Sequence, residues 1–373
     1  MKKIILVSNT SWYLYNFRLS IIKLFIAQGF EVICIANHDE YSEKLEQNGA
    51  KFIKSALENK GKNPLNDYRY FSFLFKIYKQ INPAFIFHYT IKPNIYGSMA
   101  AKKAGIPSIA IVSGAGHAFI KDNLLTNIAR KLYTKAAKCC TEMWFVNCED
   151  QQLFEEQKIT EFVKTKVLPG EGINTEIFKR DKAYPVDTSE FTFLLSGRML
   201  WDKGIGIYIE AARIIKKQYP NTKFQLLGFI DNLNPSAISK EQIDSWVEEG
   251  VVEYLGATDN VQLFLNKINC FVLPSYYKEG VPKSLLEAAS LEIPLITTDN
   301  VGCREVVTDG YNGFLCKIKD ADSLAEKIEM MINMPKQNLI TMGLNSRKKV
   351  TDQFHESLVL DFYRGILKTE LNN

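Results

Sequence analysis

Short apolar runs alternate with longer segments of helical spacing along the first half of the chain. Lys2–Val7 and Phe85–His88 have the length and almost continuous apolar character of strands that are buried on both faces. Between such runs, Phe17–Gln28 is predicted to be a helix that Asn16 caps and Gly29 ends. Strands that alternate with helices of this length predict βαβ units and a parallel sheet.

The same alternation restarts in the second half. Lys179–Glu190 is polar and predicted to be a linker, and strands are expected again at Phe191–Leu195, Cys270–Leu273 and Pro294–Thr297. We therefore predict an α/β protein with two Rossmann-like, doubly wound domains that face a cleft. The domains are expected at residues 1–178 and 179–355, with the C-terminal helix, residues 356–373, crossing back onto the first. Ligands of such sheets bind at the carboxyl ends of the strands.

Composition narrows the class of protein and its location. The 373 residues are 46% hydrophobic and 24% charged, as in a soluble globular protein. No apolar stretch approaches the roughly 20 residues of a membrane-spanning helix. The seven cysteines contain no CxxC pair and are predicted to be reduced thiols of a cytoplasmic protein.

Charge is uneven along the chain, whose net charge is +4. Residues 1–178 carry 23 Lys and Arg against 16 Asp and Glu, whereas residues 179–373 carry 23 against 26. A basic, aromatic-rich first half fits an anionic membrane surface or lipid head group. An ordinary solvated surface is the alternative interpretation.

Two carboxylates follow the strand predicted at Cys270–Leu273. Glu279 and Glu287 are eight residues apart, with Pro282 predicted in the first turn of a helix. If both acids lay on that helix, they would be about 12 Å apart along it and about 80° apart around it. They could then bind two ends of one elongated ligand at the positive end of the helix.

Two cations follow the strand predicted at Phe191–Leu195. Gly197 permits close backbone approach, and Arg198 and Lys203 flank the start of the next helix. A guanidinium offers a planar fork for phosphate oxygens and an ammonium offers a point charge, so the pair suits a diphosphate. Two surface cations beside a turn are the alternative. Cations for a diphosphate together with carboxylates for hydroxyl groups describe a nucleotide-sugar site.

These motifs resemble those of the family 4 retaining glycosyltransferases, which have the GT-B fold. That family carries a strand followed by a Gly-Arg…Lys-Gly loop, and two glutamates separated by seven residues. The segments Pro169–Asn174, Gly302–Val307 and Asp309–Phe314 also resemble the family. The resemblance extends over nearly the whole chain and is stronger in its second half.

The resemblance implies a role for each matching residue of the second domain. Arg198 and Lys203 would hold the donor diphosphate and stabilise the departing nucleotide, Glu279 would bind the donor sugar, and Glu287 would bind the ribose. The residues predicted to bind the donor are Gly197, Gly256, Thr258, Gly280, Val281, Pro282, Lys283 and Glu287.

The first domain is expected to hold the acceptor. Its aromatic segment Ser8–Arg18 resembles that of transferases acting on polyprenyl-diphosphate-linked sugars, notably N-acetylgalactosaminyltransferases of the PglA type. Arg18 and Lys92 are candidates for the acceptor diphosphate, with plain surface cations as the alternative. The residues predicted to bind the acceptor are Asn9, Thr10, Arg18, His88, Lys92 and Gly114.

Two histidines are candidates for the cleft. His117 belongs to the glycine-rich segment that begins at Ser113, where many family members carry the histidine instead. His117 is accordingly either catalytic or a structural loop residue. His88 ends a predicted strand and is either a cleft residue or a structural histidine.

The resemblance predicts a retaining hexosyltransferase. It would move a sugar, with GalNAc or another N-acetylhexosamine as the best choice, from a UDP-sugar to an undecaprenyl-diphosphate-linked saccharide at the cytoplasmic face of the inner membrane. We expect no cofactor, metal or nucleic-acid partner, since Arg198 and Lys203 would supply the charge of a cation. The alternatives are a nucleotide-sugar epimerase or phosphorylase, and a non-catalytic glycan- or membrane-binding subunit of a biosynthetic complex.

Overall fold

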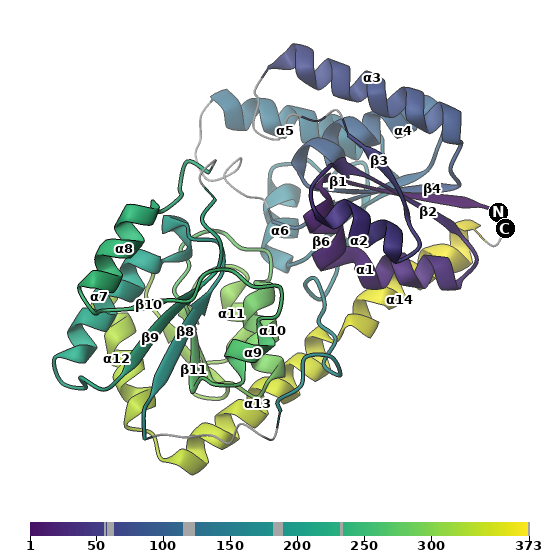
Figure 1. Cartoon of the computed structure of the whole chain (residues 1–373). Helices are drawn as coiled ribbons and strands as arrows, with labels where there is room; N and C mark the ends of the chain where they lie inside the picture. Colours follow the sequence, from purple (N-terminus) through teal and green to yellow (C-terminus); the bar gives the residue numbers. More distant parts are fainter. Residues whose placement is uncertain (56, 58–62, 115–123, 182–188, 232–233, 372–373) are drawn as a thin grey trace. The chain divides into compact units, whose positions relative to one another are not determined.

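The computed structural model describes residues 1–55, 57, 63–114, 124–181, 189–231 and 234–371. The chain divides into two compact units, Met1–Glu171 with Glu356–Asn373, and Gly172–His355 (Figure 1). The boundary therefore lies at residues 171 and 172 and not at the predicted 178 and 179. Ile173 explains the difference, because it is buried in the core of the second unit and its N–H donates to the Phe354 carbonyl over 2.9 Å.

A seven-stranded parallel sheet forms the centre of the first unit, in the order β3-β2-β1-β4-β5-β6-β7. Its strands are β1 (Lys3–Thr10), β2 (Glu31–Asn37), β3 (Lys51–Lys54), β4 (Phe85–Tyr89), β5 (Ser108–Val112), β6 (Glu142–Phe145) and β7 (Lys164–Val167). Alternate residues of β1 belong to different cores, with Ile4 and Leu6 on one face and Ile5 and Val7 on the other. Both faces of the sheet are thus covered, as the continuous apolar runs predict.

Helices cover the two faces of this sheet. One face is covered by α1 (Ser11–Ala27), α2 (Tyr41–Gln47) and α14 (Glu356–Ile366), and α14 continues into η4 (Leu367–Leu371). The other is covered by α3 (Pro64–Ile81), η1 (Pro93–Gly97), α4 (Ser98–Ala104), α5 (Leu124–Ala137) and α6 (Cys148–Glu156).

The start of α1 differs from the prediction. Thr10, and not Asn16, is the N-cap, and its hydroxyl accepts a hydrogen bond from the Tyr13 N–H over 3.2 Å. Asn16 lies inside the helix and donates to the Trp12 carbonyl. A threonine hydroxyl at a strand end satisfies a first-turn amide, so the helix can begin at once. Most of the aromatic segment Ser8–Arg18, which lies largely before the predicted helix at Phe17–Gln28, is therefore helical.

The second unit contains a six-stranded parallel sheet in the order β10-β9-β8-β11-β12-β13. Its strands are β8 (Thr192–Ser196), β9 (Lys223–Leu227), β10 (Glu253–Tyr254), β11 (Cys270–Leu273), β12 (Leu295–Thr298) and β13 (Gly313–Cys316). Its helices are η3 (Trp201–Lys203), α7 (Ile205–Lys216), α8 (Lys240–Glu248), α9 (Gln262–Leu265), α10 (Lys283–Ser290), α11 (Cys303–Val306), α12 (Ala321–Ile332) and α13 (Lys336–Phe354).

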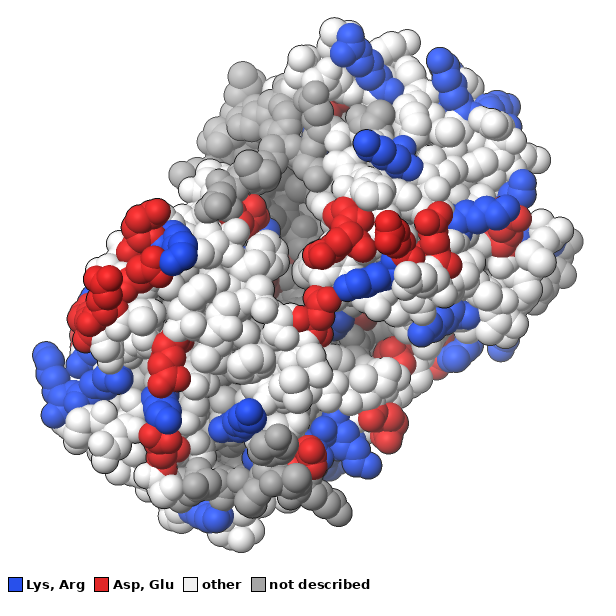
Figure 2. Space-filling view, in the orientation of Figure 1, with Lys and Arg blue, Asp and Glu red and all other residues white. Residues whose placement is uncertain are grey.

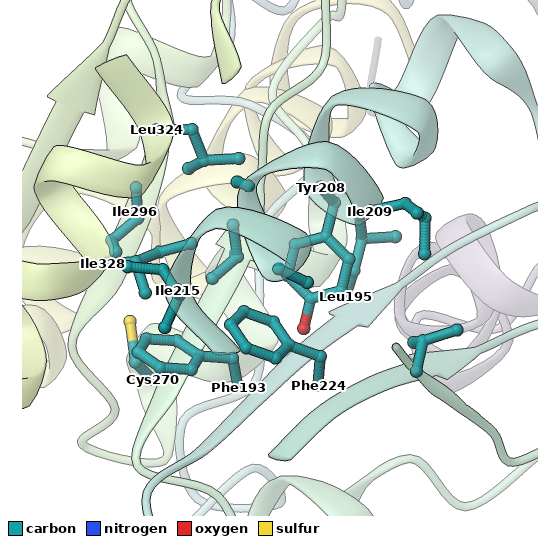
Figure 3. Packing of buried hydrophobic residues seen from close by; sticks show 14 of the residues in the cluster. Phe193, Leu195, Tyr208, Ile209, Ile215, Phe224, Cys270, Ile296, Leu324 and Ile328 are labelled. Atoms are coloured by element: carbon teal, nitrogen blue, oxygen red, sulfur yellow. The ribbon is translucent and has the colours of Figure 1, made fainter. Parts of the chain in front are cut away.

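The core of the second unit is apolar and rich in aromatic rings (Figure 3). Phe193 of β8 stacks on Phe224 of β9 with ring centroids 5.4 Å apart, and Tyr208 of α7 meets Phe224 edge-on. Cys270 and Ile328 close the same cluster from β11 and α12. This packing fixes β8 and β11 as rigid neighbours, so that the loops after them are held in a defined place.

Among the described residues, no helix is both long enough and apolar enough to cross a bilayer.

Candidate functional site

The strand order of the second unit reverses between β8 and β11, which are neighbours in the sheet although 73 residues lie between Ser196 and Cys270. Both strands are parallel, so their carboxyl ends meet at one edge. The loop of Gly197–Lys203 follows β8, and the loop of Pro274–Gly280 follows β11. In doubly wound sheets this reversal point is where ligands bind.

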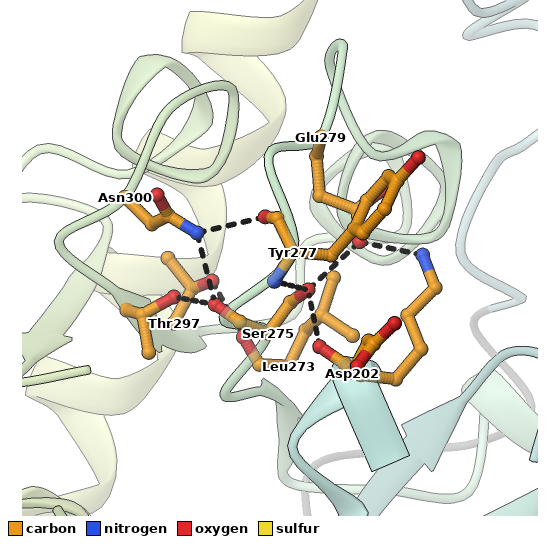
Figure 4. A network of polar contacts seen from close by, with 9 residues as sticks. Asp202, Leu273, Ser275, Tyr277, Glu279, Thr297 and Asn300 are labelled. Atoms are coloured by element: carbon orange, nitrogen blue, oxygen red, sulfur yellow. Dashed lines mark hydrogen bonds and ion pairs between the residues drawn. The ribbon is translucent and has the colours of Figure 1, made fainter. Parts of the chain in front are cut away.

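Lys203 and Glu279 come into direct contact at this edge. The Nζ atom of Lys203 lies 2.6 Å from Oε1 of Glu279 (Figure 4). The two side chains are 18% and 11% exposed, so the pair is largely shielded while both groups still reach solvent. The structure thus brings together a cation and an acid that the sequence analysis assigns to one site.

Two glycines allow close backbone contacts with the loop after β11, Gly204 from the segment after β8 and Gly302 from the segment after β12. Gly204 has φ +77°, and a Cβ there would lie 2.0 Å from the Pro274 carbonyl oxygen. Gly302 has φ +74°, and a Cβ there would lie 1.8 Å from the carbonyl oxygen of Gly280. Only glycine combines a left-handed backbone with such an approach. A larger residue at Gly204 would push the Lys203 segment away from the loop that carries Glu279, and one at Gly302 would displace Gly280.

Side chains that the sequence analysis missed hold the loop carrying Glu279. The Ser275 hydroxyl donates to Oε1 of Glu279 over 2.8 Å. The Asn300 amide donates to the carbonyls of Ser275 and Tyr277, over 3.3 and 2.7 Å, and the Thr298 hydroxyl also donates to the Ser275 carbonyl (Figure 4). All of these residues follow or end β11 and β12, which are adjacent strands. Their positions at or after the ends of predicted strands were the signal in the sequence that could have identified them as site residues.

Glu287 and Glu279 do not share a helix. Because α10 begins at Lys283, Glu279 lies in the preceding loop, and the predicted spacing of 12 Å along a helix does not describe the pair. Glu287 lies in α10, where burial raises the pKa of its carboxyl and the nearby Lys283 ammonium opposes that rise. Pro282 precedes α10 and gives it no side-chain cap. A ligand oxygen can take that place at the positive end of the helix.

The remaining predicted donor residues lie after strands of the same sheet. Arg198 is 44% exposed and lies 3.5 Å from a carboxylate oxygen of Asp231. Gly256 follows β10, and its carbonyl accepts from the Gly228 N–H over 2.7 Å. Thr258 is exposed and accepts from the Asn260 N–H. The N–H of Gly197 donates to the Leu227 carbonyl. Val281 is buried in the core of the second unit.

Arg18 is placed differently from its predicted role as a ligand of the acceptor diphosphate. It is fully buried, its guanidinium forms an ion pair with Glu171, and it donates to the Tyr13 hydroxyl over 2.6 Å. The guanidinium also lies over the ring of Tyr89, 4.5 Å from the ring centroid. Because its charge is already neutralised inside the unit, Arg18 is a structural residue.

His88 and Lys92 are also engaged elsewhere. His88 is fully buried, its Nε2 lies 3.0 Å from the Tyr78 hydroxyl, and burial lowers the pKa of its imidazole to about 3. The prediction that it faces a binding site is wrong, since this histidine is neutral and enclosed. Lys92 pairs with Asp67 of α3, with 2.8 Å between Nζ and the carboxylate, so that it too is held by a protein partner.

Three predicted acceptor residues lie at or just after the carboxyl ends of β1 and β5. Asn9 and Thr10 lie at the carboxyl end of β1, where Asn9 accepts from the Ser8 hydroxyl and Thr10 caps α1. Gly114 follows β5 with φ +139°. His117 lies outside the described residues.

Comparisons with known proteins bear on both halves of the chain. Residues 176–349 match the family described as "Glycosyl transferases group 1", and residues 3–147 match "Glycosyl transferase 4-like". Fold, site and matches together define a glycosyltransferase.

Two curated relatives and one solved structure extend this result. The chain is 31% identical to an N,N'-diacetylbacillosaminyl-diphospho-undecaprenol alpha-1,3-N-acetylgalactosaminyltransferase of Campylobacter jejuni, over 98% of each chain. It is 26% identical to a UDP-Gal:alpha-D-GlcNAc-diphosphoundecaprenol alpha-1,3-galactosyltransferase of Escherichia coli, over 76% of this chain and 74% of the other. The structure of Anabaena Alr3699/HepE with UDP and glucose superposes with a TM-score of 0.81 at 17% identity, covering 99% of this chain and all of the other.

The chain therefore belongs to the group 1 glycosyltransferases, and its two parallel-sheet domains have the GT-B fold.

Proposed function

We propose that this glycosyltransferase moves a sugar from a UDP-sugar to an undecaprenyl-diphosphate-linked saccharide, with retention of the anomeric configuration. UDP-GalNAc is the preferred donor of the proposal. The contact between Lys203 and Glu279 at the reversal point of the second sheet is the observation that carries it. The Campylobacter and Escherichia relatives, whose names specify undecaprenyl-linked acceptors, support the choice of acceptor.

The proposed donor site uses groups that follow two strands, β8 and β11. Arg198 and Lys203 bind the diphosphate, and Lys203 exchanges part of its contact with Glu279 for a phosphate oxygen. Glu279 then accepts hydrogen bonds from hydroxyl groups of the transferred sugar, while its loop stays fixed through Ser275. Glu287 accepts from the ribose, as carboxylates do in dinucleotide-binding folds.

The proposed chemistry needs no nucleophile from the protein. The bond between the anomeric carbon and the phosphate oxygen breaks, and the acceptor hydroxyl forms a bond to that carbon from the same face. The hydroxyl proton passes to an oxygen of the departing diphosphate, so that the products are the glycosylated acceptor and UDP. The chain contributes orientation of the two substrates and stabilisation of the charge that develops on the diphosphate.

Charge stabilisation is assigned to Arg198 and Lys203, so the proposal requires no divalent metal. Turnover that survives treatment with a chelator would agree with this part, and turnover restored only by added metal would contradict it. The acceptor is a membrane lipid, so the proposal also places the protein peripherally on the cytoplasmic face of the membrane.

Release of UDP, measured with and without acceptor, tests the reaction. We expect UDP and an extended lipid-linked saccharide only when UDP-GalNAc and the acceptor are both present. Conversion of the UDP-sugar alone into its epimer would support the epimerase alternative and contradict a transferase. Substituting UDP-Gal and UDP-GlcNAc in parallel reactions identifies the preferred sugar.

A further inference from the structure

Three helices of the first unit, α3, α4 and α5, lie together on one face of its sheet (Figure 1) and carry a strong excess of positive charge. Asp67 is the single acidic residue within them, and it is already paired with Lys92 and accepts from the Tyr96 hydroxyl. Figure 2 shows several basic side chains over α3 and α4. The cations of the three helices are Arg69, Lys76, Lys79, Lys102, Lys103, Arg130, Lys131 and Lys135.

Exposed apolar side chains stand beside these cations. On α3, Leu65 is 56% and Tyr68 65% exposed, and Lys76 continues the same outward stripe at helical spacing. On α5, Ile128 is 46% exposed, and the exposed Lys131 follows it by three residues. Each helix thus presents an apolar group near its start and lysines further along.

The direction in which α3 and α5 run determines where their exposed apolar side chains lie. A crossover helix runs back across its sheet, so α3 and α5 begin near the carboxyl ends of β3 and β5. Leu65 and Ile128 therefore lie toward the edge of the sheet where an α/β domain binds its ligand. The lysines extend from that edge along the outer surface.

The lysines of this surface are available to an external partner. Lys76, Lys79, Lys102, Lys131 and Lys135 form no ion pair with a carboxylate of any residue that the structure describes. Lys103 of α4 lies over the ring of Phe75 of α3, 4.8 Å from its centroid, which joins two of the helices into one continuous surface.

We propose that the outer surface of α3, α4 and α5 docks on an anionic phospholipid bilayer, with Leu65, Tyr68 and Ile128 inserted at the interface. Alkyl side chains gain free energy on entering the acyl boundary, and adjacent lysines are attracted by the anionic head groups. A nucleic acid would interact favourably with the lysines but would not bury Leu65 and Ile128. The inference rests on the proposed function in one respect, because a lipid-linked acceptor would be drawn from the same membrane.

Sedimentation with vesicles of phosphatidylglycerol and phosphatidylcholine tests the surface. Each lysine near an anionic leaflet contributes about 1 kcal/mol, and about 1.4 kcal/mol is tenfold in affinity. The triple variant Lys76→Gln/Lys131→Gln/Lys135→Gln is therefore expected to bind about a hundredfold more weakly than wild type. A matched variant of the second unit, Lys217→Gln/Lys240→Gln/Lys336→Gln, is expected to bind like wild type.

Further binding experiments separate the apolar from the electrostatic contribution to vesicle binding. Leu65→Ser is expected to weaken binding to the same vesicles, and vesicles of phosphatidylcholine alone are expected to bind wild type poorly. Equal binding by the two triple variants, with melting temperatures like wild type, would overturn the proposal. So would loss of DNA or RNA binding in the first triple variant while vesicle binding stayed unchanged.

A water-soluble acceptor with a short lipid chain distinguishes this inference from the proposed function. The triple variant of the first unit is expected to transfer sugar to that acceptor at the wild-type rate, and to lose rate only with vesicle-embedded acceptor. Absence of transfer by wild type to either acceptor would contradict the proposed function. The sedimentation experiment with vesicles would still test the proposed membrane surface.

Discussion

Replacing Lys203 by methionine separates folding from chemistry at the proposed donor site. The substitution keeps the length of the side chain and leaves the Glu279 carboxylate, 11% exposed, without its cation. Removing one partner of a fully buried pair costs about 3–5 kcal/mol. Residual exposure and the remaining hydrogen bond from Ser275 reduce this, and we expect about 2 kcal/mol. That corresponds to a fall in Tm of about 4–8 °C for a unit of this size.

Turnover should fall much further than stability does. Removing one preorganised donor to a developing charge costs about 10²–10³ in kcat. The double variant Lys203→Met/Glu279→Gln has no uncompensated charge, so its Tm should return toward that of wild type while turnover stays low. Thermal melting and UDP release, measured on the same preparations, provide the comparison. Near-normal turnover in Lys203→Met, or recovery of turnover together with Tm in the double variant, would refute the assignment.

Three further predictions address residues around and beyond this pair. Asn300→Ala releases the Tyr277 carbonyl and leaves the Ser275 carbonyl with Thr298 as its side-chain donor. The Glu279 loop should therefore loosen, and KM for the UDP-sugar should rise about tenfold, which is about 1.4 kcal/mol; an unchanged KM in initial-rate kinetics would show that the loop does not depend on Asn300. Burial raises the pKa of Glu287 above its ordinary value of 4.5, so the folded state binds its proton more tightly than the unfolded state and loses stability as the pH rises through that range. Glu287→Gln should consequently melt above wild type at neutral pH, and the difference in Tm should vanish below pH 4.5. Equal melting of the two proteins at every pH would show that the carboxyl is solvated. Arg18→Met should lower the free energy of unfolding by about 3–5 kcal/mol, much of it restored by adding Glu171→Gln, whereas affinity for UDP should not change.

Much of the fold could be predicted from the hydrophobic pattern. The runs at Cys270–Leu273 and Phe85–His88 became strands because a strand covered on both faces needs continuous apolar residues. Helix ends were harder, as Asn16 shows. Several residues can cap a helix, and the choice depends on where the preceding strand ends, which local sequence does not reveal.

The position of a candidate site residue could be predicted where chain order determines it. Arg198, Lys203 and Glu279 follow strands, and parallel strands bring their carboxyl ends to one edge. Prediction failed for Arg18 and His88, because the sequence gives no sign of which polar side chains will be enclosed. Arg18 is buried against Glu171, which is distant in sequence, and His88 against Tyr78 of a neighbouring helix. Asn300 was missed for a related reason, since its function depends on a carbonyl of an adjacent strand end.

A crystal structure of the protein with UDP-GalNAc is the most direct test of the central claim that one nucleotide sugar is held by the strand ends of the second unit. The account predicts the diphosphate between Arg198 and Lys203, the ribose hydroxyls at Glu287 and the sugar at Glu279. A nucleotide bound away from the ends of β8 and β11, or one that left Lys203 without contact to a phosphate, would contradict it.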